Sequence, residues 1–143
     1  MIAAIAAILL GVSAMTPADQ SRADAAVHAL GQAVLADPNY AGRDWRGIAL
    51  VIEIAPRKRM YGFVYDADDW EAETPDDFDV IAQAQALAEA MSDGGDRWRR
   101  CLLKIKRASG GAPELKVEFD YDGTADWTVT PANHAAMVET LRP

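Results

Sequence analysis

The sequence has few of the residues that build common catalytic and metal sites. Its single cysteine, Cys101, excludes an internal disulfide and a cysteine-based zinc site. Its two histidines, His28 and His134, neighbour no serine or cysteine nucleophile in a recognisable motif. Glycine-rich phosphate loops, paired-histidine zinc motifs and nucleophile elbows are also missing from the sequence. We therefore expect no enzymatic activity, no cofactor and no bound metal.

Positive charge is scarce relative to negative charge. The 143 residues include 22 acidic and 14 basic side chains, which gives a formal net charge of −8. Such a chain is a poor nucleic-acid binder, because neutralising phosphates requires clustered Lys and Arg. A protein partner with a basic surface suits it better. Half of the residues (50%) are hydrophobic, so a chain of this length can bury a core and form one domain.

The first residues, MIAAIAAILLGVSA, are apolar but too short to span a bilayer comfortably. We treat residues 1–14 as an extension and residues 15–143 as a single α+β domain. Three interpretations of the extension stay open: an upstream start before Met15, a secretory signal or weak anchor, and a structural helix. Residues 12–14 fit a cleavage site, but no Lys or Arg precedes the apolar run. The first interpretation implies a cytoplasmic protein, and the second a periplasmic or membrane-anchored one.

Hydrophobic periodicity predicts three helices and two hairpins. Thr16-Pro17 begins a helix that runs to about Ala36, and Thr74-Pro75 and Thr130-Pro131 open the other two. The second helix is predicted to stop at Asp93-Gly94-Gly95. The predicted strands cover residues 45–54, 59–65, 98–107 and 114–121, and short turns join them in pairs.

The predicted strand at 114–121 alternates regularly. Leu115, Val117, Phe119 and Tyr121 share the face expected to be buried, whereas Lys116, Glu118, Asp120 and Asp122 share the face expected to meet water. Both faces of the strand at 45–54 are nearly apolar, which favours a central position. The class is therefore α+β: a four-stranded antiparallel sheet from two hairpins with helices packed on it, in the order α-ββ-α-ββ-α.

Residues 66–79 form an acidic segment that we interpret as a partner-binding surface. The candidate contact residues are Asp66, Asp68, Asp69, Trp70, Glu71 and Glu73. The alternative is a solvated loop with a helix-capping cluster, in which Trp70 folds back onto the core. A calcium loop does not fit, because Glu71 and Asp77 stand where that motif requires glycine and glutamate.

A second acidic and aromatic patch comprises Asp120, Asp122, Asp126 and Trp127. Its alternative interpretation is a turn at Asp122-Gly123 with Trp127 packed on the sheet. The sequence does not say whether the two patches lie together. Cys101 is expected to be a buried, inert thiol. The basic side chains of the strand at 98–107 are expected to pair with the acidic strand opposite.

This layout resembles the YezG-like immunity (antitoxin) family of bacterial polymorphic-toxin systems. The resemblance runs through residues 18–142 and rests on the strand from Trp45 to Ile54, the aromatic strand from Met60 to Tyr65, and the strand opened by Trp98. The most family-like portion begins at Trp98, passes through the glycine turn and ends in Val117-Glu118-Phe119-Asp120-Tyr121-Asp122.

The resemblance implies a small cytosolic protein that binds and blocks a cognate toxin, often a nuclease, and has no catalytic residues. Two other interpretations stay open: a small-ligand-binding or enzymatic α+β domain, and an exported envelope protein. A second copy of the chain, paired along an exposed edge strand, is an alternative partner. We expect no membrane association apart from residues 1–14.

Overall fold

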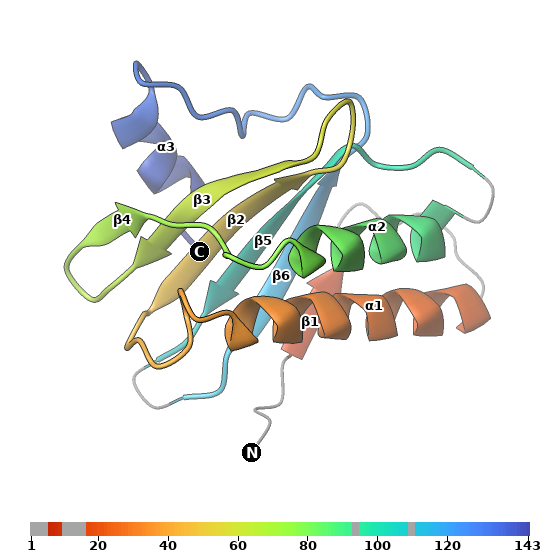
Figure 1. Cartoon of the computed structure of the whole chain (residues 1–143), viewed down its shortest axis with the longest axis horizontal. Coiled ribbons are helices and arrows are strands. Elements are labelled where there is room, and N and C mark those ends of the chain that lie inside the picture. Colours follow the sequence, from red (N-terminus) through yellow and green to blue (C-terminus); the bar gives the residue numbers. More distant parts are fainter. Residues whose placement is uncertain (1–5, 10–16, 93–94, 109–110) are drawn as a thin grey trace.

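One sheet with helices on both faces organises the chain (Figure 1). The computed structural model describes residues 6–9, 17–92, 95–108 and 111–143. The expected cap at Thr16, the alternative start at Met15 and the cleavage-site residues 12–14 lie outside the described residues. So do Asp93-Gly94 of the expected helix stop and Ser109-Gly110 of the expected turn.

The two predicted hairpins are present. Strand β2 (Gly47–Glu53) pairs antiparallel with β3 (Arg59–Tyr65), and β5 (Arg100–Lys106) pairs antiparallel with β6 (Glu114–Asp120). Strand β2 also pairs antiparallel with β5, which joins the hairpins into one sheet. Its seven residues are all buried, so the predicted central position is confirmed.

The expected number and order of strands were wrong. The sheet order is β1-β6-β5-β2-β3-β4, in which five strands are antiparallel and β1 (Ala6–Leu9) pairs in parallel with β6. Strand β4 (Trp70–Ala72) lies inside the acidic segment and pairs with β3. Three residues are too few to show an alternating pattern, and the uniformly apolar β1 has none. The structural-helix interpretation does not hold for Ala6–Leu9, which form a strand.

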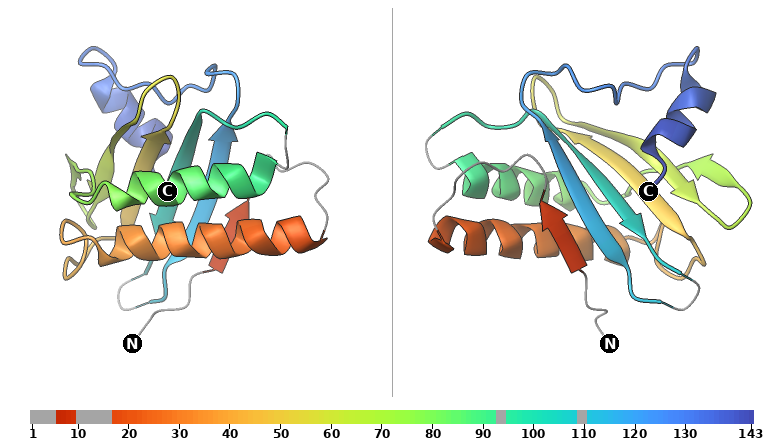
Figure 2. Two further views of the ribbon diagram at one scale, coloured as in Figure 1. Left: turned by 45° about the vertical axis from the view of Figure 1, so that its right-hand side comes forward. Right: turned by 180° about the vertical axis from the view of Figure 1, so that it is seen from behind.

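Helices α1 (Pro17–Ala36) and α2 (Asp79–Ser92) lie side by side over one face of the sheet (Figures 1 and 2). Apolar side chains at helical spacing turn inward, because this is the only stripe of each helix that can leave water. The inward residues of α1 are Ala23, Val27, Leu30 and Val34, and those of α2 include Val80, Ala84 and Leu87. They meet Ile48, Leu50 and Ile52 of β2 in the main core.

Helix α3 (His134–Leu141) covers part of the opposite face (Figure 2). Met137, Val138 and Leu141 pack there in a second cluster with Ala49 and Val51 of β2. The Tyr65 hydroxyl donates a 2.7 Å hydrogen bond to the Val138 carbonyl oxygen, which fixes the helix to β3. The sheet face that the alternation of residues 114–121 assigned to water therefore carries a second core over β2 and β3, where the sequence pattern of β2 was already nearly apolar.

The start of α3 differs from the prediction. The helix begins at His134 rather than directly after Thr130-Pro131. The Thr130 backbone N–H donates to Asn133 Oδ1 (2.7 Å), and the Asn133 N–H donates to Thr130 Oγ1 (3.2 Å). This reciprocal pair closes a turn before the helix, so Thr130 caps the turn and Asn133 precedes the first helical residue.

Candidate partner-binding surface

The tip of the β3–β4 connection carries exposed carboxylates. Asp66, Asp68 and Asp69 are all exposed. A backbone hydrogen bond from Asp66 N–H to the Asp69 carbonyl oxygen (2.8 Å) closes the turn. The Asp69 carboxylate also accepts the Trp70 backbone N–H at 2.8 Å. The turn therefore projects Asp66 and Asp68 into solvent while it uses Asp69 to hold its own shape.

The next two carboxylates, Glu71 and Glu73, are partly neutralised within the molecule. Arg43 Nη2 lies 2.5 Å from Glu71 Oε1, and Arg43 Nη1 lies 3.5 Å from Glu73 Oε2. Glu73 Oε1 also accepts the Thr74 backbone N–H at 3.1 Å. Most of the uncompensated negative charge of this surface is therefore at the turn rather than along β4.

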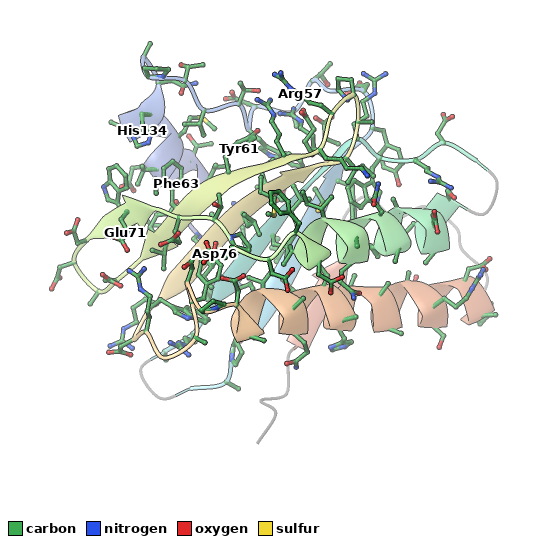
Figure 3. All side chains as sticks on the ribbon, viewed as in Figure 1. Arg57, Tyr61, Phe63, Glu71, Asp76 and His134 are labelled. Atoms are coloured by element: carbon green, nitrogen blue, oxygen red, sulfur yellow. The ribbon has the colours of Figure 1, made fainter. Side chains whose placement is uncertain are left out.

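Trp70 is half-buried at the centre of an aromatic cluster. Its ring meets Phe63 edge-on at a centroid distance of 5.5 Å and lies 5.3 Å from the His134 ring. Phe63 and His134 also meet edge-on at 5.2 Å, between β3 and α3 (Figure 3). Trp70 thus packs partly on the second core cluster, as the alternative interpretation held, and keeps part of its surface accessible.

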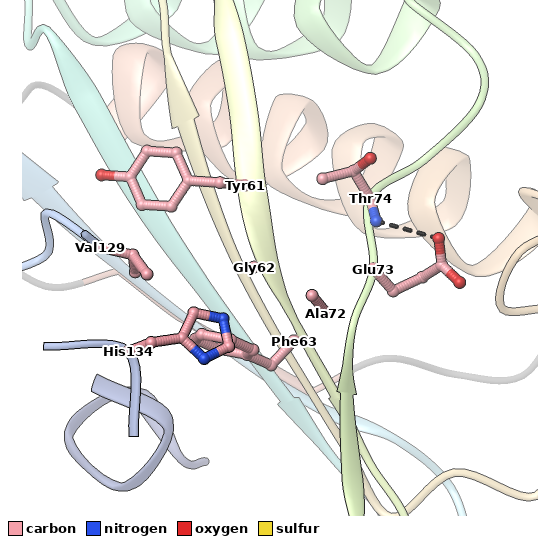
Figure 4. Close-up of a pocket in the computed structure, with 8 residues that line it drawn as sticks. All are labelled: Tyr61, Gly62, Phe63, Ala72, Glu73, Thr74, Val129 and His134. Carbon is pink, nitrogen blue, oxygen red and sulfur yellow. Dashed lines mark hydrogen bonds between the residues drawn. The ribbon is translucent and has the colours of Figure 1, made fainter. Parts of the chain in front are cut away.

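A shallow open pocket of about 260 Å³ lies beside this cluster (Figure 4). Its walls include the side chains of Tyr61, Phe63, Glu73 and His134. Gly62 forms part of the floor, where a Cβ atom would overlap the Ala49 carbonyl oxygen of β2. The pocket thus combines aromatic walls with a carboxylate, a lining that suits an inserted cationic or aromatic side chain.

The remaining acidic residues of the segment serve the fold. Asp37 is buried, and its carboxylate accepts the Asp77 backbone N–H and the Asn39 backbone N–H, each at 3.0 Å. The Asn39 amide donates to Asp76 Oδ1 at 3.0 Å. These bonds tie the end of α1 to the residues before α2. The Asp77 carboxylate accepts the Asp79 backbone N–H at 2.8 Å where α2 begins, so the capping interpretation describes Asp77, whereas Asp37 was not predicted to take part.

Asp120 does not belong to a solvent-exposed patch, contrary to the prediction. It is 4% exposed, and Arg100 donates to its Oδ2 from Nε (2.8 Å) and Nη2 (2.5 Å). The reason is that the chain after β6 returns over this face. Arg100 Nη2 also donates to the Ala125 carbonyl oxygen (2.9 Å), and its guanidinium lies 5.5 Å from the Trp127 ring centroid. Asp120 is the counter-charge that holds this arginine.

Trp127 and Asp122 occupy different environments within the same returning segment. Trp127 is half-buried against the second core cluster, so it packs on the sheet as the alternative interpretation held. Asp122 is exposed, and its carboxylate accepts the Thr124 hydroxyl (2.6 Å) and backbone N–H (3.1 Å). These hydrogen bonds lower the pKa of Asp122. Asp122 is thus a turn residue that stays ionised.

The two acidic patches lie at opposite ends of the strands. Tyr65, which leads into the Asp66 turn, is paired with Gly47, and Gly47 is paired with Lys106 on its other side. Asp120 pairs with Arg100 at the far end of the same sheet. The structure therefore does not merge the patches into one surface, and the β3–β4 tip stands as a separate candidate.

His134 belongs to the candidate surface and the buried Phe63 supports it from below, but neither was predicted there. Period-two alternation places Tyr61, Phe63 and Tyr65 on one face of β3, and this signal was available in the sequence. Nothing local indicates that α3 returns to that face with His134 in its first turn. Only the docking of α3 brings the imidazole to Trp70.

Other features of the structure bear on binding chemistry. In residues 6–9, 17–92, 95–108 and 111–143, no three His, Cys, Asp or Glu side chains are grouped to hold a metal ion. None of the helices in the described part has the length and hydropathy that a bilayer-spanning segment needs.

Neither a protein-family model nor a curated protein sequence matches this chain.

Proposed function

We propose that this protein is an immunity protein that binds and neutralises a cognate bacterial toxin, and that the β3–β4 tip is its contact surface. One observation carries the proposal: the exposed carboxylates of Asp66 and Asp68 adjoin the half-buried Trp70 and the pocket beside it. Charge next to a partly buried aromatic side chain is typical of an interface with one dominant contact. The resemblance of residues 18–142 to an immunity family supports the same function.

The proposed mechanism is occlusion without catalysis. The net charge of −8 and the acidic tip attract a basic surface over a long range and raise the association rate. Trp70 and the neighbouring pocket then supply the close contact that slows dissociation. A nuclease is the toxin class that fits best, because an active site that binds phosphates is basic. A cytoplasmic location belongs to this proposal, since the nucleic acids to be protected are there.

The outer edge of β4 offers a second type of contact to the same partner. Strand β4 ends the sheet order on this side, and an extended partner segment could add to such an edge. The acidic side chains beside it favour a basic segment over a second copy of this acidic chain. A monomer in the absence of toxin is therefore part of the proposal.

A pull-down from native cells tests the proposed function. Tagged protein is captured at low salt, and bound proteins are identified by mass spectrometry before and after a salt step. We expect one toxin-like protein with a basic domain, released as ionic strength rises because exposed charges are screened. Recovery of a small molecule without any protein partner would contradict the proposal.

Charge reversal tests whether the β3–β4 tip of this protein contacts the partner that the pull-down captures. Asp66→Lys/Asp68→Lys changes the tip and spares the internal contacts of Asp69 and Glu71. The matched control is Asp24→Lys/Asp96→Lys, which makes the same charge change at exposed positions on α1 and before β5. We expect the tip variant to lose capture and protection and the control to keep both. Equal loss in both variants would assign the effect to net charge.

A further inference from the structure

The face of the sheet that carries α3 is only partly covered. Helix α3 packs over β2 and β3 and reaches Leu102 of β5, and it leaves the rest of β5 and all of β6 without a helix on that side (Figure 2). A groove of about 520 Å³ lies there, at the end of the sheet where β5 finishes and β6 begins. Its lining, among the described residues, includes the cationic side chains of Lys104, Lys106, Lys116 and Arg142 together with one acidic residue, Glu114. Four cationic side chains thus gather in one hollow of an acidic protein.

Two of these lysines are placed directly against one another. Lys104 of β5 and Lys116 of β6 are cross-strand partners, so their side chains leave the sheet on the same face. Like charges in this position destabilise a sheet. The side chain of Lys104 is only 20% exposed, which weakens the screening of this repulsion by water.

Carboxylates near the groove offset only part of this charge. Glu118 lies 3.8 Å from the Lys104 ammonium, and Glu114 is the cross-strand partner of Lys106. Glu139 forms a two-point ion pair with Arg142 at 2.7 and 3.0 Å. Among the described residues, no carboxylate lies within 4.0 Å of the Lys116 ammonium. The lysine pair therefore keeps uncompensated positive charge beside the hollow.

Arg142 is held in place before any ligand binds. Its guanidinium lies 4.7 Å from the Tyr65 ring centroid, and Glu139 orients it from the preceding turn. The following residue, Pro143, packs against Gly47, where a Cβ atom would come within 3.1 Å of the proline Cγ. The arginine wall of the groove is thus preorganised, which lowers the entropic cost of binding.

We propose that this groove binds a small multivalent oxyanion, namely a metabolite that carries phosphate or carboxylate groups. An anion between Lys104 and Lys116 would replace their mutual repulsion with two attractions. The groove volume of about 520 Å³ falls within the range of small-molecule sites. This site lies apart from the β3–β4 tip and does not depend on the immunity proposal.

Calorimetric titration tests the site with two defined probes, tripolyphosphate and citrate, at constant ionic strength. We expect saturable binding of at least one probe at a single site per chain. Lys104→Gln/Lys116→Gln should weaken it by about tenfold or more. Arg57→Gln/Lys58→Gln, on the β2–β3 connection, also removes two positive charges; it is the matched control and should change affinity by less than about twofold. The stronger probe identifies phosphate or carboxylate as the preferred group.

Thermal unfolding gives a readout that a purely structural lysine would not produce. Without added anion, Lys116→Gln should raise the melting temperature, because it removes the repulsion from Lys104. With saturating probe, the wild type should gain stability and the variant should gain far less. Equal affinity of wild type and double variant would overturn the proposal. Tighter binding of a short oligonucleotide than of tripolyphosphate would also overturn it, in favour of a nucleic-acid site.

Discussion

Arg100 and Asp120 lie directly opposite one another on β5 and β6 and form a buried ion pair. Their side chains are 5% and 2% exposed, so water does not compensate either charge. The same guanidinium donates to the carbonyl oxygen of Ala125 and to the Thr128 hydroxyl. This pair therefore joins the hairpin to the segment that leads into α3.

Replacing Asp120 should destabilise the protein strongly. Asp120→Ala leaves the buried Arg100 without its counter-charge, and we expect a loss of about 3–5 kcal/mol in the free energy of unfolding. The exposed Asp126→Ala is the control and should be close to neutral. Urea unfolding of both variants measures the difference. Equal stability of the two variants would show that the ion pair has no net effect.

Alkaline unfolding should report on Tyr65. Burial raises the pKa of Tyr65 from 10.0 to about 12, so the folded state keeps the proton while the unfolded chain loses it. The protonated Tyr65 hydroxyl therefore contributes about 2–3 kcal/mol to the free energy of unfolding. This contribution is present in full below pH 10 and is lost between about pH 10 and 12. Tyr65→Phe should flatten that part of the curve of stability against pH. An unchanged alkaline limb would contradict the assignment.

Tyr40 provides a matched comparison for Tyr65. Burial and the nearby Glu73 raise the pKa of Tyr40 as well. Its buried hydroxyl has no hydrogen-bond partner among the described residues, whereas the Tyr65 hydroxyl bonds to Val138. At neutral pH, Tyr65→Phe should cost about 1 kcal/mol and Tyr40→Phe less, because only the first removes a hydrogen bond. Urea unfolding at pH 7 ranks the two variants.

Cys101 should be protected from thiol reagents in the folded protein. It is fully buried on β5, and burial raises its pKa, so neither the thiolate nor access for the reagent is available. We expect an aromatic disulfide reagent to react with Cys101 only in concentrated urea or at the rate of unfolding. Fast labelling of the native protein would mean that the main core opens at β5.

Glycine is required at position 62 for a different reason than at position 42. A Cβ atom on Gly62 would overlap the Ala49 carbonyl oxygen, and we expect Gly62→Ala to cost about 3 kcal/mol. Gly42 has φ of 79° with open space around it, so Gly42→Ala should cost about 1 kcal/mol through backbone strain alone. Gly42→Asn should recover part of that loss, because asparagine tolerates this conformation. Urea unfolding of the three variants tests the distinction.

Binding kinetics should separate charge from aromatic contact at the β3–β4 tip. For the partner captured by pull-down, Asp66→Lys/Asp68→Lys should slow association by about tenfold or more at low salt. Trp70→Phe should instead speed dissociation, because it removes part of the close contact and preserves an aromatic ring. Surface plasmon resonance measures both rates. Association that is equally fast at low and high salt would rule out electrostatic steering.

Much of the sheet was predictable because its hairpins are local. Regular alternation and short connections were sufficient to place β2 with β3 and β5 with β6. The two-sided apolar pattern of β2 also predicted its central position. Strand β4 could not be predicted, because Trp70–Ala72 become a strand through pairing with β3 and through the packing of Trp70 on Phe63.

Asp120 and Asp122 separate what the sequence determines from what tertiary structure decides. Their spacing places both on one face of a strand and predicts the same environment for each. In the folded chain, Asp120 is buried against Arg100 and Asp122 is exposed in a turn. Periodicity assigns residues to a face, but burial depends on what later covers that face. Here it is the return of the chain towards α3, held by Arg100, that buries one carboxylate and leaves the other in water.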